Sequence, residues 1–350
     1  MKKKKIVVLM GGPSSEHEVS LHTGMEVIKN LAAKKYEILP VVILRNRAWM
    51  FLPSRSFLSS AGAKTAPMKG GVTMRETSAL EKVRREKSDI TFLAVHGEFG
   101  EDGTIQKLLQ AHGIPYTGSG VFASAVGMDK PKSAVLFREA GLSVPEFLVF
   151  SRNSWRSTPD RIIRAIAKKF SPSCVIKPAD RGSSVGVHIV KVGRELRAAL
   201  TDAFSYSHSV MAQEFVRGRE ITCGVLERAD GSIFSLPPIE IIPKKGAYYD
   251  YASKYHKGGS EHVIPPRGIP KKTISAIQDA SVAAHAVIGC GGYSRTDFIL
   301  SEDGKLHTLE INTLPGMTQT SLLPEAARTA GIRFPDLLDS ILIGSLRRAA

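Results

Sequence analysis

The chain opens with an apolar strand, a glycine turn and an amphipathic helix, and this order constrains the fold more than any other feature. Residues 6–10 form an apolar run, residues 11–15 are turn-forming, and residues 18–34 carry apolar side chains at helical spacing. Further strands are predicted over 38–44 and 90–95. Strands that alternate with helices form a parallel sheet covered by helices, so the sequence predicts an α/β fold.

The second half of the chain has a different pattern, with some strands close enough together to pair antiparallel. Periodicity predicts helices over 131–140, 160–169 and 274–288, strands at 147–150, 294–300 and 307–311, and two helices near the C-terminus. Two more strands flank a Gly/Ser turn at 178–186. Residues 243–266 have no usable periodicity, and so long a stretch is more typical of a lid than of a passive connection.

Composition restricts the class of protein. The 350 residues predict two or three domains, and 43% hydrophobic residues suffice for buried cores. Apolar runs such as residues 41–44 are far shorter than the ~18–20 residues of a membrane helix. The Lys-rich start does not indicate a signal peptide, because the apolar stretch after it ends at Gly11. Cys174, Cys223 and Cys290 lie far apart without metal-ligand spacing, which favours a reducing cytoplasm.

A formal net charge of +15 raises the question of nucleic-acid binding. The excess is spread along the chain, and no stretch combines clustered basic residues with stacking aromatic side chains. We therefore expect no nucleic-acid partner. A diffuse positive field also suits a small anionic substrate or improves solubility.

Residues 11–20, GGPSSEHEVS, lie where the first strand leads into a helix. A helix N-terminus offers unpaired backbone N–H groups, but the GxGxxG spacing of a dinucleotide site is absent. Glu16 and Glu18 would repel a pyrophosphate and would suit a substrate ammonium group. An ordinary turn, in which Glu18 stabilises the helix start, is the alternative.

A second candidate site begins at Lys177, which ends a predicted strand and precedes the Gly/Ser turn. Small residues let backbone amides approach phosphate oxygens, and a lysine neutralises their charge. The segment is not a Walker A loop, because residues 187–190 continue as a strand rather than a helix. A plain hairpin loop is the alternative.

Oxygen-bearing side chains lie on the two strands near 297 and 310. Glu310 and Asn312 share one face of a strand because alternate residues point the same way. With Asp297 they offer two carboxylates and one amide oxygen, which suits magnesium held between protein and substrate phosphates. A solvated polar strand face is the alternative.

His96 follows the third predicted strand and precedes a helix, the position where open α/β sheets place ligand-binding loops. A single histidine is weak evidence. Asp102 in the same segment could simply cap the helix.

Together these motifs resemble the D-alanine:D-alanine ligases, ATP-grasp enzymes of peptidoglycan precursor synthesis. The resemblance covers nearly the whole chain, through GGPSSEHEVS (11–20), HGEFGEDGTIQ (96–106), YTGSG (116–120), MDK (128–130), KPADRGSSVGV (177–187), GRE (218–220), YYDYASKY (248–255), RTDF (295–298), EINTLPGMT (310–318) and SLLPEAA (321–327). It implies a three-domain ATP-grasp architecture with an N-terminal parallel-sheet (pre-ATP-grasp) domain. The expected domains are residues 1–129, 130–218 and 219–350, with ATP held between the last two.

The resemblance also implies roles for individual residues. In the substrate site, it places Glu16 on the ammonium of the first D-alanine, Val19 and His96 beside that substrate, Arg295 and the Gly316 N–H on the oxyanion, and Ser321 and Leu322 at the second D-alanine. The implied ATP contacts are Lys130, Lys177, Gly182, Ser183, Ser184, Gln213, Glu214, Phe215, Glu220 and Lys254. Asp297, Glu310 and Asn312 would hold two Mg²⁺ or Mn²⁺ ions. A cytoplasmic homodimer with no membrane partner is expected.

Three features depart from the family pattern. Gln213 stands where an acid is expected in the adenine-contacting stretch, so it can accept a hydrogen bond but lacks the charge. Asp180 and Arg181 precede the Gly-Ser pair, where a neutral residue is more usual. Residues 45–75 match nothing assignable. A ligase of the same mechanism that uses D-lactate, D-serine or another amino acid second is the nearest alternative, and a catalytically silent nucleotide-binding or nucleic-acid-binding protein is a more distant one.

Tyr255 generates the first prediction, because the resemblance places it in a lid that reaches Ser183 and Glu16 on closure. The closed lid would keep water from an acyl phosphate. Tyr255→Ala should therefore raise ADP release relative to dipeptide. ADP and dipeptide measured in parallel check this, and an unchanged ratio would contradict the predicted role of Tyr255.

Overall fold

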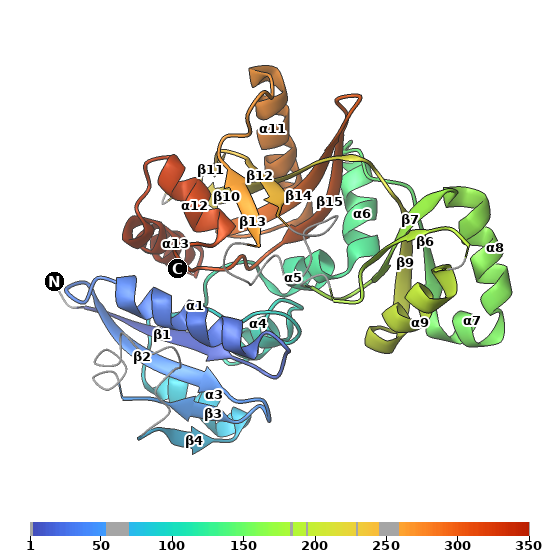
Figure 1. Ribbon diagram of the computed structural model, residues 1–350. Helices are drawn as coiled ribbons and strands as arrows, with labels where there is room; N and C mark the ends of the chain where they lie inside the picture. The colour runs from blue at the N-terminus through green and yellow to red at the C-terminus, as the bar shows by residue number, and fades with distance from the viewer. Residues whose placement is uncertain are drawn as a thin grey trace.

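The computed structural model describes residues 3–53, 70–182, 185–193, 195–228, 230–244 and 259–349. Its strands form three sheets within these ranges, ordered β4-β3-β2-β1-β5, β6-β9-β7-β8 and β13-β12-β10-β14-β15, with β11 paired to β10. In Figure 1 the first sheet lies at the lower left, the second at the right, and the third at the upper centre between them. Within the described residues, no helix combines the length and apolarity that crossing a membrane requires.

The N-terminal sheet has the predicted parallel centre. Strand β1 (Lys4–Gly11) pairs in parallel with both β2 (Tyr36–Ile43) and β5 (Ile90–Leu93). Two short strands were not predicted, β3 (Trp49–Phe51) and β4 (Val72–Met74), which extend the sheet antiparallel with β4 at its edge. Strands of three residues are too short to show periodicity. The helices of this part of the chain are α1 (His17–Asn30), α3 (Glu76–Arg85) and α4 (Thr104–Ala111). The next helix, α5 (Val121–Met128), packs against α6 (Lys130–Glu139) and β15 (Leu306–Asn312) instead.

The central sheet is antiparallel throughout. Its strands are β6 (Phe147–Ser151), β7 (Ser173–Pro178), β8 (His188–Lys191) and β9 (Ser209–Glu214). Strands β7 and β8 flank the Gly/Ser turn, as predicted. The helices of this part are α7 (Arg152–Ser157), α8 (Pro159–Phe170) and α9 (Leu196–Tyr206). Helix α8 buries Ile162, Ile166 and Phe170, which recur every four residues and therefore share one helix face.

The C-terminal sheet carries the polar strands that sequence analysis singled out. Its strands are β10 (Gly218–Glu227), β11 (Ile233–Ser235), β12 (Ile239–Pro243), β13 (Ser260–Val263), β14 (Tyr293–Ser301) and β15 (Leu306–Asn312). The stretch 243–266 was expected to lack regular structure, but β13 pairs antiparallel with β12. Four residues at a sheet edge give little sequence signal. The rest of that stretch includes residues 245–258, which lie outside the described residues.

Four further helices pack against or between the sheets. They are α6 (Lys130–Glu139), α11 (Lys271–Ile288), α12 (Leu322–Thr329) and α13 (Phe334–Ala349). Helix α6 packs against β15 and α11, although the expected domain boundary groups it with the central sheet. Leu337, Leu338 and Ile341 of α13 are buried in the same apolar cluster as the strands of the N-terminal sheet. This shared core holds the N-terminal and C-terminal sheets together.

Buried His285 on α11 generates a prediction about stability. Its Nδ1 lies 2.8 Å from Ser294 Oγ, while its Nε2 has no hydrogen-bond partner among the described residues. Burial lowers the pKa of His285 from 6.5 to about 4. Between these values the unfolded chain binds more protons than the folded chain, so stability falls as pH falls through this window.

We expect the wild-type protein to lose about 2 kcal/mol of unfolding free energy between pH 7 and pH 5 through this group. His285→Gln should flatten that part of the pH dependence, and His208→Gln, at an exposed position, should not. Urea unfolding at both pH values measures this. Equal slopes in the three proteins would assign the pH dependence to other groups.

Candidate active site

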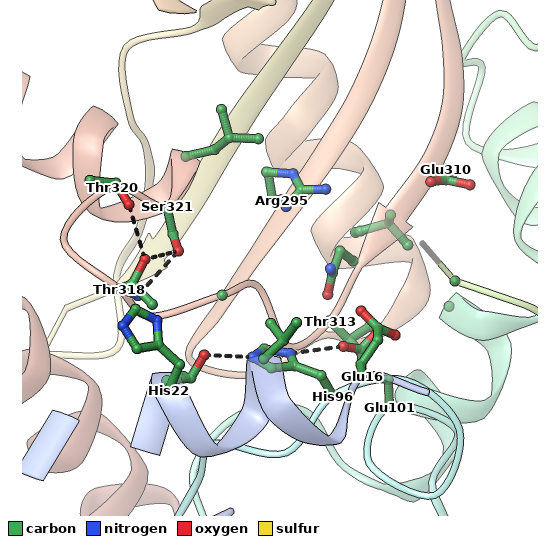
Figure 2. A pocket seen from close by; sticks show the side chains of 18 of the residues that line it. Glu16, His22, His96, Glu101, Arg295, Glu310, Thr313, Thr318, Thr320 and Ser321 are labelled. Atoms are coloured by element: carbon green, nitrogen blue, oxygen red, sulfur yellow. Dashed lines mark hydrogen bonds and ion pairs between the residues drawn. The ribbon is translucent and has the colours of Figure 1, made fainter. Parts of the chain in front are cut away.

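A cavity of about 980 Å³ lies where parts of all three sheets meet. Figure 2 shows Glu16 and His96 on its N-terminal side, Arg295 and Glu310 on the strands opposite, and Thr318, Thr320 and Ser321 on the loop before α12. Of the residues singled out by sequence analysis, Glu16, Val19, His96, Lys130, Gly182, Arg295, Glu310, Asn312, Gly316, Ser321 and Leu322 line it.

Glu16 lies just before α1 and is only 5% exposed. Its backbone N–H donates to Ser14 Oγ over 3.2 Å, and Ser14 Oγ in turn donates to His96 O over 2.8 Å. Gly97 has a φ of +69°, and a Cβ there would lie 2.5 Å from Glu16 Oε2. A glycine at 97 is therefore needed both for the turn and for space beside the carboxylate. The result is a buried acid in the cavity wall, which suits a cationic group.

His96 is held by two side chains. Its Nε2 lies 3.0 Å from Thr23 Oγ1 and its Nδ1 lies 3.2 Å from Glu101 Oε1. Asp102 accepts hydrogen bonds from the backbone N–H groups of Phe99 and Thr104, both over 2.9 Å. Asp102 therefore stabilises the turn but does not cap α4, whose N-cap position is Gly103 and has no side-chain hydrogen bond, while His96 faces the cavity.

Two buried lysines lie close to Glu310. Lys130, 6% exposed at the start of α6, has its Nζ 3.2 Å from Glu310 Oε2 and donates to Arg181 O over 2.6 Å. Lys177 is the last residue but one of β7, and burial lowers its pKa to about 8, with Glu310 acting in the opposite direction. A buried cation needs a nearby anion. Two such cations around one carboxylate form a site with capacity for additional negative charge.

The predicted oxygen ligands lie on the neighbouring strands β14 and β15. Asp297 pairs with Glu310, and Arg295 pairs with Asn312, directly across the two strands. Arg295 donates to both carboxylate oxygens of Asp297, through Nε and Nη2, each over 3.0 Å. Asn312 Oδ1 accepts from the N–H of Leu314 over 2.8 Å. Asp297 is therefore engaged by Arg295, while Glu310 and Asn312 line the cavity.

The side chains on these two strands can be compared with the ligands that a metal ion requires. Within the described ranges, no three His, Cys, Asp or Glu side chains are grouped so as to hold a metal ion by themselves. Two carboxylates and an amide oxygen at cross-strand positions nevertheless supply hard donors, which suit magnesium completed by phosphate oxygens. The residues thus fit a metal that arrives with a phosphorylated substrate.

Hydroxyl groups gather at the N-terminus of α12. Ser321 Oγ lies 2.8 Å from Thr318 Oγ1 and accepts from the Thr318 N–H over 3.1 Å. A Cβ at Gly316 would lie 3.0 Å from Ser321 Oγ, so Gly316 allows the loop to approach the helix closely. Hydroxyls beside a helix N-terminus suit a carboxylate.

The expected adenine-contacting residues do not line this cavity. Gln213, on β9, is 2% exposed, and its Nε2 has no hydrogen-bond acceptor among the described residues. Glu214 Oε2 accepts from the N–H of Glu146 over 3.2 Å, Phe215 follows the strand, and Glu220 lies on β10. A buried amide donor without a protein acceptor fits a ligand that supplies one. Ser183, Ser184, Lys254 and Tyr255 lie outside the described residues.

Several other residues line the cavity that were not singled out from the sequence, namely His22, Thr23, Glu101, His262, Thr318, Thr320 and Glu325. His22 could have been found, because it follows Glu18 by four residues and therefore shares its helix face. His262 and Glu325 could not have been found, because they lie on different elements, β13 and α12. The folded chain brings His262 Nδ1 to 2.6 Å from Glu325 Oε2.

The fold and this cavity define an α/β protein of the ATP-grasp class. Family models described as "D-ala D-ala ligase N-terminus" and "D-ala D-ala ligase C-terminus" match residues 5–119 and 136–343. The chain belongs to the D-alanine–D-alanine ligase family, which confirms the resemblance seen in the sequence.

Individual relatives support this assignment over the full length. A D-alanine–D-alanine ligase from Anaeromyxobacter dehalogenans is 40% identical over 346 residues, which cover 99% of this chain and 98% of the relative. The structure of VanG D-Ala:D-Ser ligase from Enterococcus faecalis superposes with a TM-score of 0.80 at 30% identity, covering 99% of this chain and all of that one. The D-alanine–D-alanine ligase from Bacillus anthracis complexed with ATP gives 0.74 at 31% identity, covering 99% and 98%.

Proposed function

We propose that the protein joins two D-alanines into D-alanyl-D-alanine for peptidoglycan precursor synthesis and converts ATP to ADP and phosphate. One observation carries the proposal: a D-alanine–D-alanine ligase is 40% identical to this chain across 99% of its length. The cavity agrees with it, since a buried acid, a cationic centre and a hydroxyl cluster suit an ammonium, a phosphate and a carboxylate, respectively.

The reaction needs no nucleophilic side chain. A carboxylate oxygen of the first D-alanine attacks the γ-phosphorus of ATP, and ADP leaves. The amine of the second D-alanine then attacks the acyl carbon, and phosphate leaves after the amine has lost a proton. Catalysis therefore depends on positioning and on stabilising negative charge as it shifts between oxygens.

The first substrate would bind at the N-terminal side of the cavity. Glu16 would hold its ammonium, with Val19 and His96 beside it, and His96 would be oriented by Thr23 and Glu101. This arrangement would direct the substrate carboxylate toward the lysine-rich centre. A substrate with a free amine would be favoured, because its ammonium would place a cation beside the buried carboxylate of Glu16.

The second substrate and the developing oxyanion would bind nearer to α12. Ser321 and Leu322 would hold the carboxylate of the second D-alanine at the helix N-terminus. Arg295 and the Gly316 N–H would donate to the tetrahedral oxyanion. Asp297 would fix Arg295 through the two hydrogen bonds already described, and a fixed guanidinium needs little reorganisation during the reaction.

The nucleotide would bind between the central and C-terminal sheets. Lys130, Lys177 and the turn at 182–184 would contact phosphates, while the adenosine would meet Gln213, Glu214, Phe215, Glu220 and Lys254. The buried Gln213 Nε2, which has no hydrogen-bond acceptor among the described residues, supports this placement. Asp297, Glu310 and Asn312 would hold two magnesium or manganese ions, which neutralise phosphate charge and polarise the transferring group when bound.

The expected homodimer, the cytoplasmic location and the absence of nucleic-acid and membrane partners stay predictions. The three expected domains also stay a proposal, in which the cavity lies at their junction.

Product analysis tests the proposed function. ADP release should depend on D-alanine, and the main product should be D-alanyl-D-alanine when D-alanine competes with D-serine and D-lactate. The likeness to a D-Ala:D-Ser ligase makes D-serine the informative competitor. A dominant D-alanyl-D-serine or D-alanyl-D-lactate product would overturn the proposed specificity.

Glu310 generates a prediction about metal and phosphate binding. Glu310→Gln removes the carboxylate near Lys130 and Lys177 and should abolish ADP formation while the protein stays folded. Glu302→Gln, in the exposed turn between the same strands, is the matched control and should keep wild-type turnover. Near wild-type turnover of Glu310→Gln at low magnesium would show that the metal site is assigned wrongly.

A further inference from the structure

Arg181 joins two parts of the molecule that are far apart in the sequence. Its Nη1 forms an ion pair with Glu98 Oε2, 83 residues earlier. Arg181 lies in the glycine-rich turn between β7 and β8 of the central sheet, and Glu98 lies in the loop after β5 of the N-terminal sheet. The ion pair therefore bridges the nucleotide-binding and first-substrate sides of the cavity.

Two other contacts fix Arg181. Its Nε donates to the carbonyl of Tyr206, at the end of α9, over 2.8 Å. Its own carbonyl accepts from Lys130 Nζ over 2.6 Å, and Lys130 also pairs with Glu310. Arg181 thus contacts the N-terminal loop, the central helix α9 and the start of α6, so its position is tied to all three parts of the site.

Glu98 is presented by a rigid loop. Phe99 is a non-glycine residue with a φ of +75°, and it is held there by its N–H, which donates to Asp102 Oδ2 over 2.9 Å. Gln106 Nε2 donates to Gly100 O over 2.8 Å in the same loop. A strained residue persists only where surrounding contacts determine it. The backbone at Glu98 is therefore held in one conformation, from which its side chain pairs with Arg181.

The turn held by this pair lies against the first-substrate acid. Gly182 follows Arg181 directly and lines the same cavity as Glu16. A Cβ at Gly182 would lie 3.8 Å from Glu16 Oε2, so the two are in near contact. A shift of Arg181 would consequently move the turn relative to both Glu16 and Lys130.

We propose that Arg181 and Glu98 form a clasp that positions Gly182, at the start of the glycine-rich turn, beside Glu16 on the first-substrate side of the cavity. Arg181 and Glu98 are positioning residues, and the clasp's catalytic effect rests on the proposed ligase function. Their side chains are 32% and 63% exposed, so the contribution should be small and should weaken as salt increases. The clasp would explain why Arg181 stands at this position, where a neutral residue is more usual in the family.

A charge swap tests the clasp in the full-length protein. The variants are Arg181→Glu, Glu98→Arg and the double exchange. The matched controls are Arg197→Glu and Asp160→Arg, since that exposed ion pair links α9 and α8 within the central part alone. Amide hydrogen exchange of peptides spanning 178–190, measured without ligands, reports the turn directly and does not require activity.

Each single variant should speed exchange of the turn and raise the KM for the first D-alanine about two- to fivefold, with a smaller change in kcat. The double exchange should recover both quantities, higher salt should reduce the difference from wild type, and the controls should match wild type. Unchanged exchange in the single variants, or no recovery in the double exchange, would overturn the clasp. A wild-type protein that released no ADP in response to D-alanine would refute the proposed function instead. The exchange measurement would still test the clasp, because it does not require activity.

Discussion

The site depends on one buried ammonium group, that of Lys130. It is shared between the Glu310 carboxylate and the Arg181 carbonyl, which belong to the C-terminal sheet and to the glycine-rich turn. A buried charge that lost either partner would be costly, so the three groups constrain one another. Lys177 adds a second buried cation near the same carboxylate. This centre fixes where negative charge can be accepted, and the substrate positions are arranged around it.

An apolar frame holds this polar centre in place. The core shared by α13 and the N-terminal sheet fixes Glu16 and His96 relative to the strands that carry Arg295 and Glu310. Helix α6, which begins at Lys130, packs on β15 and α11. The central sheet joins this frame through a second apolar cluster, in which Met211 of β9 is buried together with residues of α6, α11 and β15. At the cavity, Arg181 and Gly182 add polar and partly exposed contacts.

The same arrangement explains how one cavity can receive differently charged groups. Glu16 supplies a buried anion, the lysines supply cations, and the hydroxyls before α12 supply neutral hydrogen-bonding groups. Arg295 lies between these regions and is held by Asp297. Because Lys130 pairs with Glu310 and Arg295 with Asp297, this part of the cavity is organised before substrate arrives, which is the condition for electrostatic stabilisation of a transition state.

Local patterns in the sequence suffice to predict the α/β class, the antiparallel strands around the Gly/Ser turn and eleven of the residues that line the cavity. These follow from local periodicity and from motifs whose order carries the family resemblance. The same patterns missed β3, β4, β11 and β13, since strands of three or four residues leave no periodic signal, and they also left the longer strands β9, β10 and β12 unpredicted. The pairing of Asp297 with Glu310, and the contacts of Lys130 with Arg181 and of Arg181 with Glu98, are seen only in the tertiary structure. They depend on cross-strand register and on how separate elements pack, and neither is encoded in the neighbourhood of any one residue.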